Sequence, residues 1–282
     1  MRKLFILLAG LFLLSNAKID SHAAGDDSEK LINATEFELI KELKDQMLSE
    51  TKEFLESESI KFNDITVGFS EASKVYVDSD ISNTNTVNEN DIMTFLKQGD
   101  YVWVIPAYGI DESSNQNVTI TVAKALPYDE KRCQVLSEEE KQLVKEEAGK
   151  WSISEIGISE NTPYTEQMKQ IGNMVDSYTI VGGLKGMFQP VAIGFQNGEA
   201  KYWISLGYDY ELLQDRSKGA KVNEGVYDYE SIKEKMDAYK DAENVSGGGN
   251  GSQERDRYSI ILPIICLLLI AVIGGKRYIK KF

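Results

Sequence analysis

The sequence predicts an α+β fold: a mostly antiparallel sheet with a long N-terminal helix and inserted short helices, plus one C-terminal transmembrane helix. Three observations predict it. A helical apolar period near the N-terminus is followed by short strand patterns separated by Gly, Pro, Asn and Asp. The chain also ends in an apolar run followed by cations. Strands joined by hairpins, with helices at the ends and between them, are typical of this fold class.

Residues 1–23 have the layout of a secretory signal peptide. Arg2 and Lys3 precede an apolar run of about eleven residues, which is shorter than the roughly 20 residues that a membrane-spanning helix needs. Ser21 and Ala23 are small residues suited to cleavage. We therefore expect the mature protein to begin near residue 24 and to be exported.

The other end predicts a membrane anchor. An apolar stretch covers 258–275, and the tail 276–282 carries four Lys or Arg residues, which places the tail in the cytoplasm. A glycine-rich linker, 246–257, precedes the helix. A wall-sorting signal is the alternative, but Leu262-Pro263 is followed by Ile-Ile, without the Thr-Gly of such signals. We expect a single-pass protein of the cell membrane with an extracellular N-terminal domain.

Residues 24–245 are predicted to form this extracellular domain. A charged segment, 28–58, has apolar residues at intervals of three, four and seven, which indicates an amphipathic helix, either broken or, if continuous, about 45 Å long. The stretch 128–150, between strand patterns, could divide the domain into two subdomains. A domain of this size can bury a core without disulfides.

Seven strands follow the helix in the sequence pattern. They are rich in Val, Ile, Tyr and Trp and are expected at 74–77, 101–108, 118–126, 152–158, 177–181, 191–195 and 200–206. Asn197-Gly198 predicts a tight hairpin turn between the last two. In the second of these strands, Tyr202, Ile204 and Leu206 share one face, and Trp203 lies on the other, where we expect it in the core.

Three shorter helices are expected. Ser137 and Glu140 form a capping-box pattern before a helix that ends near Lys150. Thr162 precedes Pro163, which we expect at the first helical position of a second helix. The third covers 229–242 and leads to the linker.

Composition excludes several kinds of chemistry. The only histidine, His22, lies in the signal peptide, so the mature domain has no Ser-His-Asp triad, Cys-His pair or histidine-bound zinc. The two cysteines, Cys133 and Cys266, are separated by the predicted membrane boundary, so no disulfide forms within the domain. Residues 25–253 carry 22 basic and 42 acidic side chains, which repel nucleic acids and anionic lipids.

One stretch, VDSDISNTNTVNEN at 77–90, raises the question of a calcium loop. Placed on an EF-hand-like loop, five residues fall at ligand positions: Asp78, Asp80, Ser82, Thr84 through its carbonyl, and Glu89. Asn83 stands where glycine is usual, and the preceding KVYV predicts a strand where a helix is required. Asp and Asn are equally typical of turns. We interpret the stretch as a polar loop, with calcium as the alternative, and expect no other cofactor.

These observations favour a non-catalytic binding, sensing or accessory module on a Gram-positive bacterial surface. Its predicted cytoplasmic tail is too short for a signalling domain, so we expect another membrane or cell-surface protein as its partner. The first alternative is a carboxylate-based cell-wall or polysaccharide enzyme, which needs two acids about 5 to 9 Å apart. The second is an immunity-type protein that captures cationic peptides.

Overall fold

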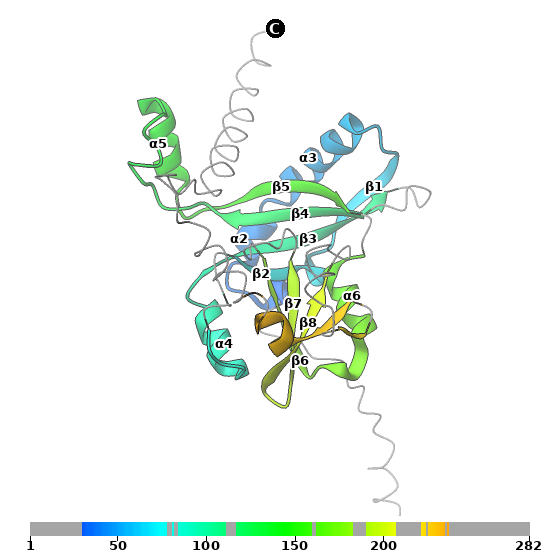
Figure 1. Cartoon of the computed structure of the whole chain (residues 1–282). Helices are drawn as coiled ribbons and strands as arrows, with labels where there is room; N and C mark the ends of the chain where they lie inside the picture. Colours follow the sequence, from blue (N-terminus) through cyan, green and yellow to red (C-terminus); the bar gives the residue numbers. More distant parts are fainter. Residues whose placement is uncertain are drawn as a thin grey trace, which may run out of the picture.

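The structure, a computed structural model, describes residues 30–77, 81, 84–110, 117–159, 162–182, 190–206, 221–223, 225–234 and 236. They form an α+β domain with short helices and a mixed, mostly antiparallel sheet of ten strands, which confirms that part of the predicted fold (Figure 1). The predicted signal peptide, linker, transmembrane helix and tail lie outside these ranges. Within them, no helix has the length and apolar character that crossing a bilayer requires.

A single parallel pair of strands joins two antiparallel halves of the sheet. The strands are β1 (Phe62–Val67), β2 (Ser73–Val77), β3 (Asp100–Ile110), β4 (Asn117–Lys124), β5 (Trp151–Ser159), β6 (Ser177–Val181), β7 (Val191–Gln196), β8 (Glu199–Ser205), β9 (Lys221–Asn223) and β10 (Val226–Asp228). Their order is β5-β4-β3-β2-β6-β7-β8-β10-β9, and β1 pairs with the end of β3 that β2 leaves open. Only β2 and β6 run parallel among these pairs, so they form the boundary between the halves.

The predicted N-terminal helix is divided into shorter pieces. The helices are η2 (Leu31–Asn33), α2 (Phe37–Lys41), α3 (Lys44–Ser57), η3 (Phe69–Glu71), α4 (Glu89–Leu96), α5 (Glu138–Glu147), α6 (Tyr164–Ile171) and η6 (Gly172–Met174), and residues 229–234 are also helical. Between α2 and α3 the Leu43 amide donates to the Ile40 carbonyl, which tightens the chain into a turn. The longest piece, α3, has 14 residues and is about 21 Å long, so the helix is broken, and the long continuous form does not occur in the described residues.

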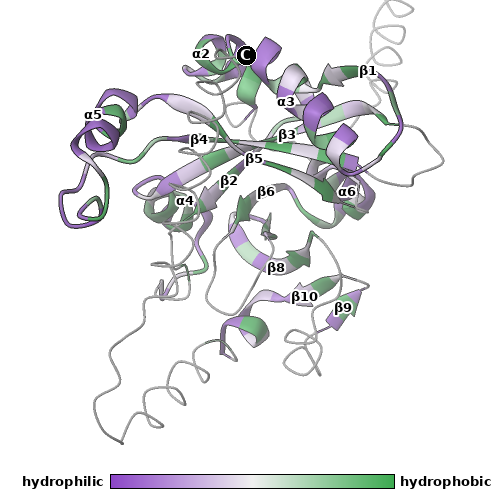
Figure 2. Ribbon diagram, turned by 90° about the horizontal axis from the view of Figure 1, so that it is seen from above, coloured by the Kyte–Doolittle hydropathy of each residue, from purple (hydrophilic) through white to green (hydrophobic). Residues whose placement is uncertain are grey.

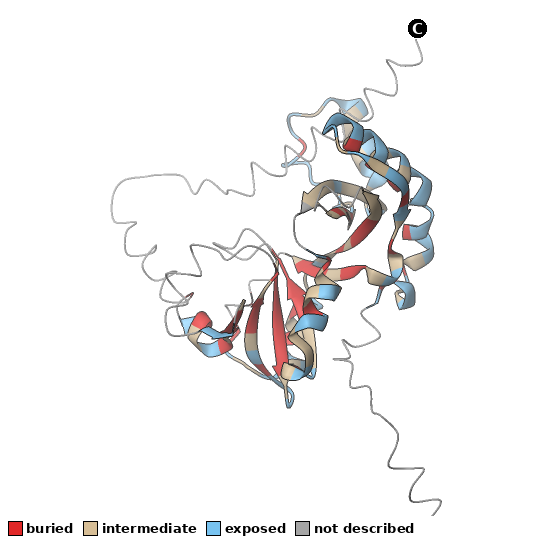
Figure 3. Ribbon diagram, turned by 90° about the vertical axis from the view of Figure 1, so that its right-hand side faces the viewer, coloured by how far each residue is buried: buried red, intermediate tan, exposed pale blue. Residues whose placement is uncertain are grey.

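Alternating side chains place apolar cores on both faces of the sheet. On the face that we call the first, α2 and α3 cover one core of the N-terminal half, and α4 with residues 229–234 covers another in the C-terminal half. On the second face, α6 covers a third core. Figure 3 shows the buried residues along the strands and exposed residues on the outer sides of the helices.

The strand predictions for β2 to β8 agree with the structure to within two residues. The hairpin turn is confirmed, because Asn197 and Gly198 both have positive φ, 54° and 75°. Trp203 is in the core, as expected. The capping box of Ser137 is present at α5. Helix α6 starts one residue later than predicted, with Pro163 as its N-cap.

Strand β1 was not predicted, because Asn63 and Asp64 are uncommon in strands. It is held against β3 at a glycine. Gly109 has a φ of 110°, and a Cβ atom there would lie 2.3 Å from the Asp64 carbonyl oxygen. Only glycine lets the two backbones approach this closely.

Strand β5 changes its apolar period through a β-bulge. Trp151 and Ile153 occupy odd positions, whereas Ile156 occupies an even one, yet all three pack against the core under α2 and α3. The register shifts between Thr121 and Val122 of β4, so that Ser154 is the additional residue, and its hydroxyl donates to the Thr121 carbonyl (3.1 Å). Because the bulge adds one residue, the apolar side chains before and after it point to the same face of the sheet.

Candidate functional site

A polar and aromatic cluster lies on the first face of the sheet, where the two halves meet. Lys74 and Tyr76 of β2 are paired across the strands with Trp103 and Tyr101 of β3, and Tyr76 also adjoins β6. Glu36, which precedes α2, reaches into this block. We call these five residues the seam cluster. At this cluster, the core beneath α2 and α3 meets the core beneath α4.

The Glu36 carboxylate accepts hydrogen bonds from three side-chain donors. The Tyr101 hydroxyl (2.8 Å) and the Trp103 indole N–H (2.9 Å) donate to Oε1, and the Thr35 hydroxyl (3.0 Å) donates to Oε2. Glu36 is buried. Burial raises its pKa, but the hydrogen bonds from Trp103, Tyr101 and Thr35 and one from the backbone outweigh burial, and the resulting pKa lies below the ordinary value. The carboxylate is therefore ionised at neutral pH.

The Lys74 ammonium lies over three aromatic rings. Its Nζ is 4.0 Å from the centre of the Tyr101 ring, 5.1 Å from that of Tyr76 and 6.0 Å from that of Trp103. These distances are typical of cation–π contacts. Burial, and next the hydrogen bond to Glu36 and its charge, raise the pKa of Tyr101, so its hydroxyl stays a donor. The cluster thus balances one carboxylate and one ammonium around aromatic side chains.

This arrangement suits a structural role better than acid catalysis. A general acid needs a raised pKa and a glycosidase needs a second carboxylate, whereas Glu36 has a lowered pKa and its donors occupy both oxygens. Across the part of the chain that the structure describes, no three His, Cys, Asp or Glu residues form a group that could hold a metal. The sequence offered no signal for this cluster, because Glu36 is 65 and 67 residues from its two strand partners.

The predicted calcium loop is only partly placed. Asp78, Asp80 and Ser82 lie outside the described residues. The Thr84 hydroxyl donates to the Ile81 carbonyl (2.8 Å), as in a polar turn. Glu89 is the first residue of α4, and its Oε1 accepts a hydrogen bond from the Ser177 hydroxyl (2.5 Å).

The segment therefore links a strand to a helix. The preceding strand, β2, is as predicted, but α4 was missed, although Asn88 is a typical N-cap and accepts from the amides of Asn90 and Asp91. The Glu89 amide also donates to the Gly198 carbonyl (2.9 Å), which ties α4 to the β7–β8 turn. Glu89 has a structural role here, and calcium binding stays a prediction.

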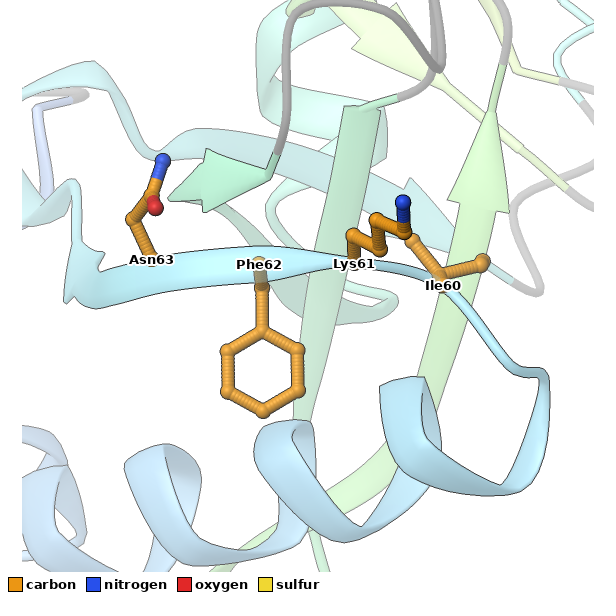
Figure 4. A pocket seen from close by; sticks show the side chains of 4 residues that line it. All are labelled: Ile60, Lys61, Phe62 and Asn63. Atoms are coloured by element: carbon orange, nitrogen blue, oxygen red, sulfur yellow. The ribbon is translucent and has the colours of Figure 1, made fainter.

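A surface hollow of about 410 Å³ adjoins the start of β1. It is lined by four consecutive residues, Ile60, Lys61, Phe62 and Asn63 (Figure 4). Phe62 points toward the neighbouring helix and packs against the core, whereas Lys61 and Asn63 point to the other side of the strand. Functional side chains from different elements do not converge on it, so it does not have the character of a ligand site.

A protruding connection is the second candidate. Residues 126–149, which we call the arm, connect the neighbouring strands β4 and β5 and contain α5. At its base, the Ala125 amide donates to the Lys150 carbonyl and the Gly149 amide to the Ala125 carbonyl, both at 2.8 Å. Figures 1 and 2 show α5 beyond the end of these strands. No residue of α5 is buried.

The arm keeps its shape through contacts of its own. The Ser137 hydroxyl accepts from the Glu140 amide and the Ser137 amide donates to the Glu140 carboxylate, which caps α5. Lys145 Nζ lies 4.4 Å from the centre of the Tyr128 ring. Cys133 is buried under the turn before α5. These contacts matter because a ten-residue helix is only marginally stable by itself in water.

Comparisons with known proteins identify no relative. The chain matches no protein-family model, and it has no significant match among curated proteins or solved structures.

Proposed function

We propose that the protein is a membrane-anchored extracellular module that binds another membrane or cell-surface protein and performs no catalysis itself. The export signal and the anchor predicted from the sequence support the location. The arm supports the binding role. The seam cluster agrees with a structural role for Glu36, because its lowered pKa makes this carboxyl group a poor proton donor.

The observation that carries this proposal is the exposed helix of the arm. The arm has 24 residues, ten of them in α5, and no residue of this helix is buried. Three of the six large apolar side chains that are exposed in the described ranges lie in it: Leu126, Val135 and Leu143. An arm that protrudes from the domain and carries exposed apolar side chains, one of them in its helix, is suited to contact a second protein.

Removing the arm tests the proposal. Residues 126–148 can be replaced by Pro-Asp, so that Pro-Asp-Gly149 closes the β4–β5 hairpin, since Gly149 already has a φ of 79°. Wild-type and arm-deleted full chains are then compared for photo-crosslinking in the cells that produce the protein, with the photoreactive residue at position 143 of the wild type and at position 53 of both chains.

We expect a discrete adduct from position 143 and none from position 53, which lies on the exposed side of α3. The deleted chain should keep its melting temperature within a few degrees, because no residue of α5 belongs to the core. The absence of any adduct at position 143, or equal adducts at positions 143 and 53, would refute the proposal.

The carboxylate-enzyme alternative is tested separately. We expect the full chain to leave cell-wall and polysaccharide substrates intact. Turnover that is abolished by a single Asp or Glu substitution would replace the binding role by catalysis.

A further inference from the structure

We infer that the outer face of α5 binds a cationic amphipathic peptide segment of its partner, with Lys or Arg residues on both sides of an apolar stripe. This inference names the partner chemistry for the proposed binding role and rests on it. It follows from how charged and apolar side chains are distributed over the arm.

Of the five Lys and Arg residues in 126–150, four have a partner within this stretch, whereas Lys131 is exposed and makes no ion pair among the described residues. Lys141 pairs with Glu138 (2.7 Å) and lies 4.0 Å from Glu130, and only 13% of its side chain is exposed. Lys145 lies over the Tyr128 ring. The remaining pairs are Arg132 with Asp129 (3.7 Å) and Lys150 with Glu147 (3.1 Å). The two cations of α5, Lys141 and Lys145, thus hold the helix against the preceding part of the arm.

The outer face of α5 is consequently acidic. Glu139, Gln142, Leu143 and Glu146 are exposed and recur at intervals of three, four and seven, so they share one side of the helix. Among the described residues, Glu139 makes no hydrogen bond or ion pair, and the Glu146 carboxylate accepts only from Gln142 (2.9 Å). Two carboxylates therefore flank Leu143 without any cation to neutralise them.

Apolar surface accompanies these carboxylates. Leu143 is 37% exposed at the middle of the face, and Val135, in the turn just before α5, is 92% exposed. An exposed apolar side chain between two carboxylates matches a segment that alternates apolar and cationic side chains. The same charges disfavour anionic lipid and nucleic acid, since the region 25–253 has 20 more acidic than basic residues.

Binding to a defined probe tests the inference. The probe is a synthetic 18-residue peptide with a Leu face flanked by Lys residues, labelled for fluorescence anisotropy. The full chain is held in zwitterionic nanodiscs, and binding to empty nanodiscs is subtracted. A peptide in which every Lys is replaced by Glu reports on charge complementarity.

Two variants of the arm are compared with a matched control. Glu139→Lys/Glu146→Lys reverses the outer face, and Glu53→Lys/Glu56→Lys makes the same change in net charge on exposed positions of α3. We expect the arm variant to weaken binding of the Lys peptide at least tenfold and the control less than twofold. Val135→Ser/Leu143→Ser should weaken binding about tenfold at unchanged net charge.

Equal weakening by the arm variant and the α3 control would overturn the inference, because it would mean that the overall negative field attracts the peptide. Binding of the Glu peptide, or binding of the Lys peptide that neither arm variant changes, would overturn it as well. A crosslink at position 143 without affinity for the Lys peptide would leave the proposed function standing and reject the cationic segment. Absence of both would reject the two together.

Discussion

Glu36 allows the structure to be tested at a single side chain. Glu36→Ala removes the acceptor of the Tyr101 hydroxyl and the Trp103 indole N–H. A buried donor left without an acceptor costs about 1 to 3 kcal/mol. Trp103 is fully buried and Tyr101 only half-buried, so water can rescue Tyr101 but not Trp103. We therefore expect Glu36→Ala to lower the free energy of unfolding by about 2 to 4 kcal/mol.

Glu36→Gln separates the charge from the shape. The amide oxygen of Gln can still accept from Tyr101 and Trp103, but the bonds lose the strength that an ionised acceptor gives. We expect a loss of about 1 to 2 kcal/mol, smaller than that of Glu36→Ala. Tyr101→Phe removes one donor, and the double variant with Glu36→Gln should show that the two losses are not additive.

The pH dependence gives the sharpest check. The pKa of Glu36 is lower in the folded protein than its ordinary value of 4.5. A lowered folded-state pKa means that the stabilisation is complete above the unfolded-state pKa and is lost as pH falls through the folded-state pKa. The gap between wild type and Glu36→Gln should hence be constant from pH 7 to about 5.5 and should shrink below about pH 4.5.

Urea unfolding of the full chain, followed by tryptophan fluorescence, measures both effects, because Trp103 lies in the seam cluster. Urea is uncharged and leaves the ionic strength unchanged across the pH series. A loss below about 0.5 kcal/mol for Glu36→Ala at pH 7 would refute the reasoning, since surface substitutions have effects of that size. So would a gap between wild type and Glu36→Gln that stays the same down to pH 3.

Three further predictions concern other parts of the fold. The Thr51 hydroxyl is fully buried in α3 and has no hydrogen-bond partner, so Thr51→Val should raise the urea midpoint, by about 1 kcal/mol in stability; a lower midpoint would contradict this. Gly109→Ala places a Cβ against the Asp64 carbonyl at a positive φ and should destabilise by about 3 kcal/mol or more; a melting temperature within 2 °C or so of wild type would refute the β1–β3 approach. We expect calorimetry to detect no saturable heat of calcium binding at the loop 77–90. A saturable heat that disappears in Asp78→Ala/Asp80→Ala would establish the calcium loop.

Local patterns were enough to predict much of the sheet. Residues close in sequence determine the Asn197-Gly198 turn, the capping box at Ser137 and strands β2 to β8. The chemistry of these residues restricts the backbone φ angle, the hydrogen bonds or the side of the sheet that a side chain faces. Elements whose partners are distant in sequence were harder to predict. Strand β1 contradicts its own propensity, and the division of the N-terminal helix depends on how α2 and α3 pack over the core.

The sequence by itself determined the α+β class and the main strands, because both depend on periods of two and 3.6 residues. Only the tertiary structure decided that β2 pairs parallel with β6 and that Ser154 forms a bulge. It also brought Glu36 to Tyr101 and Trp103 and left α5 outside the core. The physical reason is that burial and hydrogen bonds between residues 33 or more positions apart depend on the whole fold, and one sequence contains no local record of them.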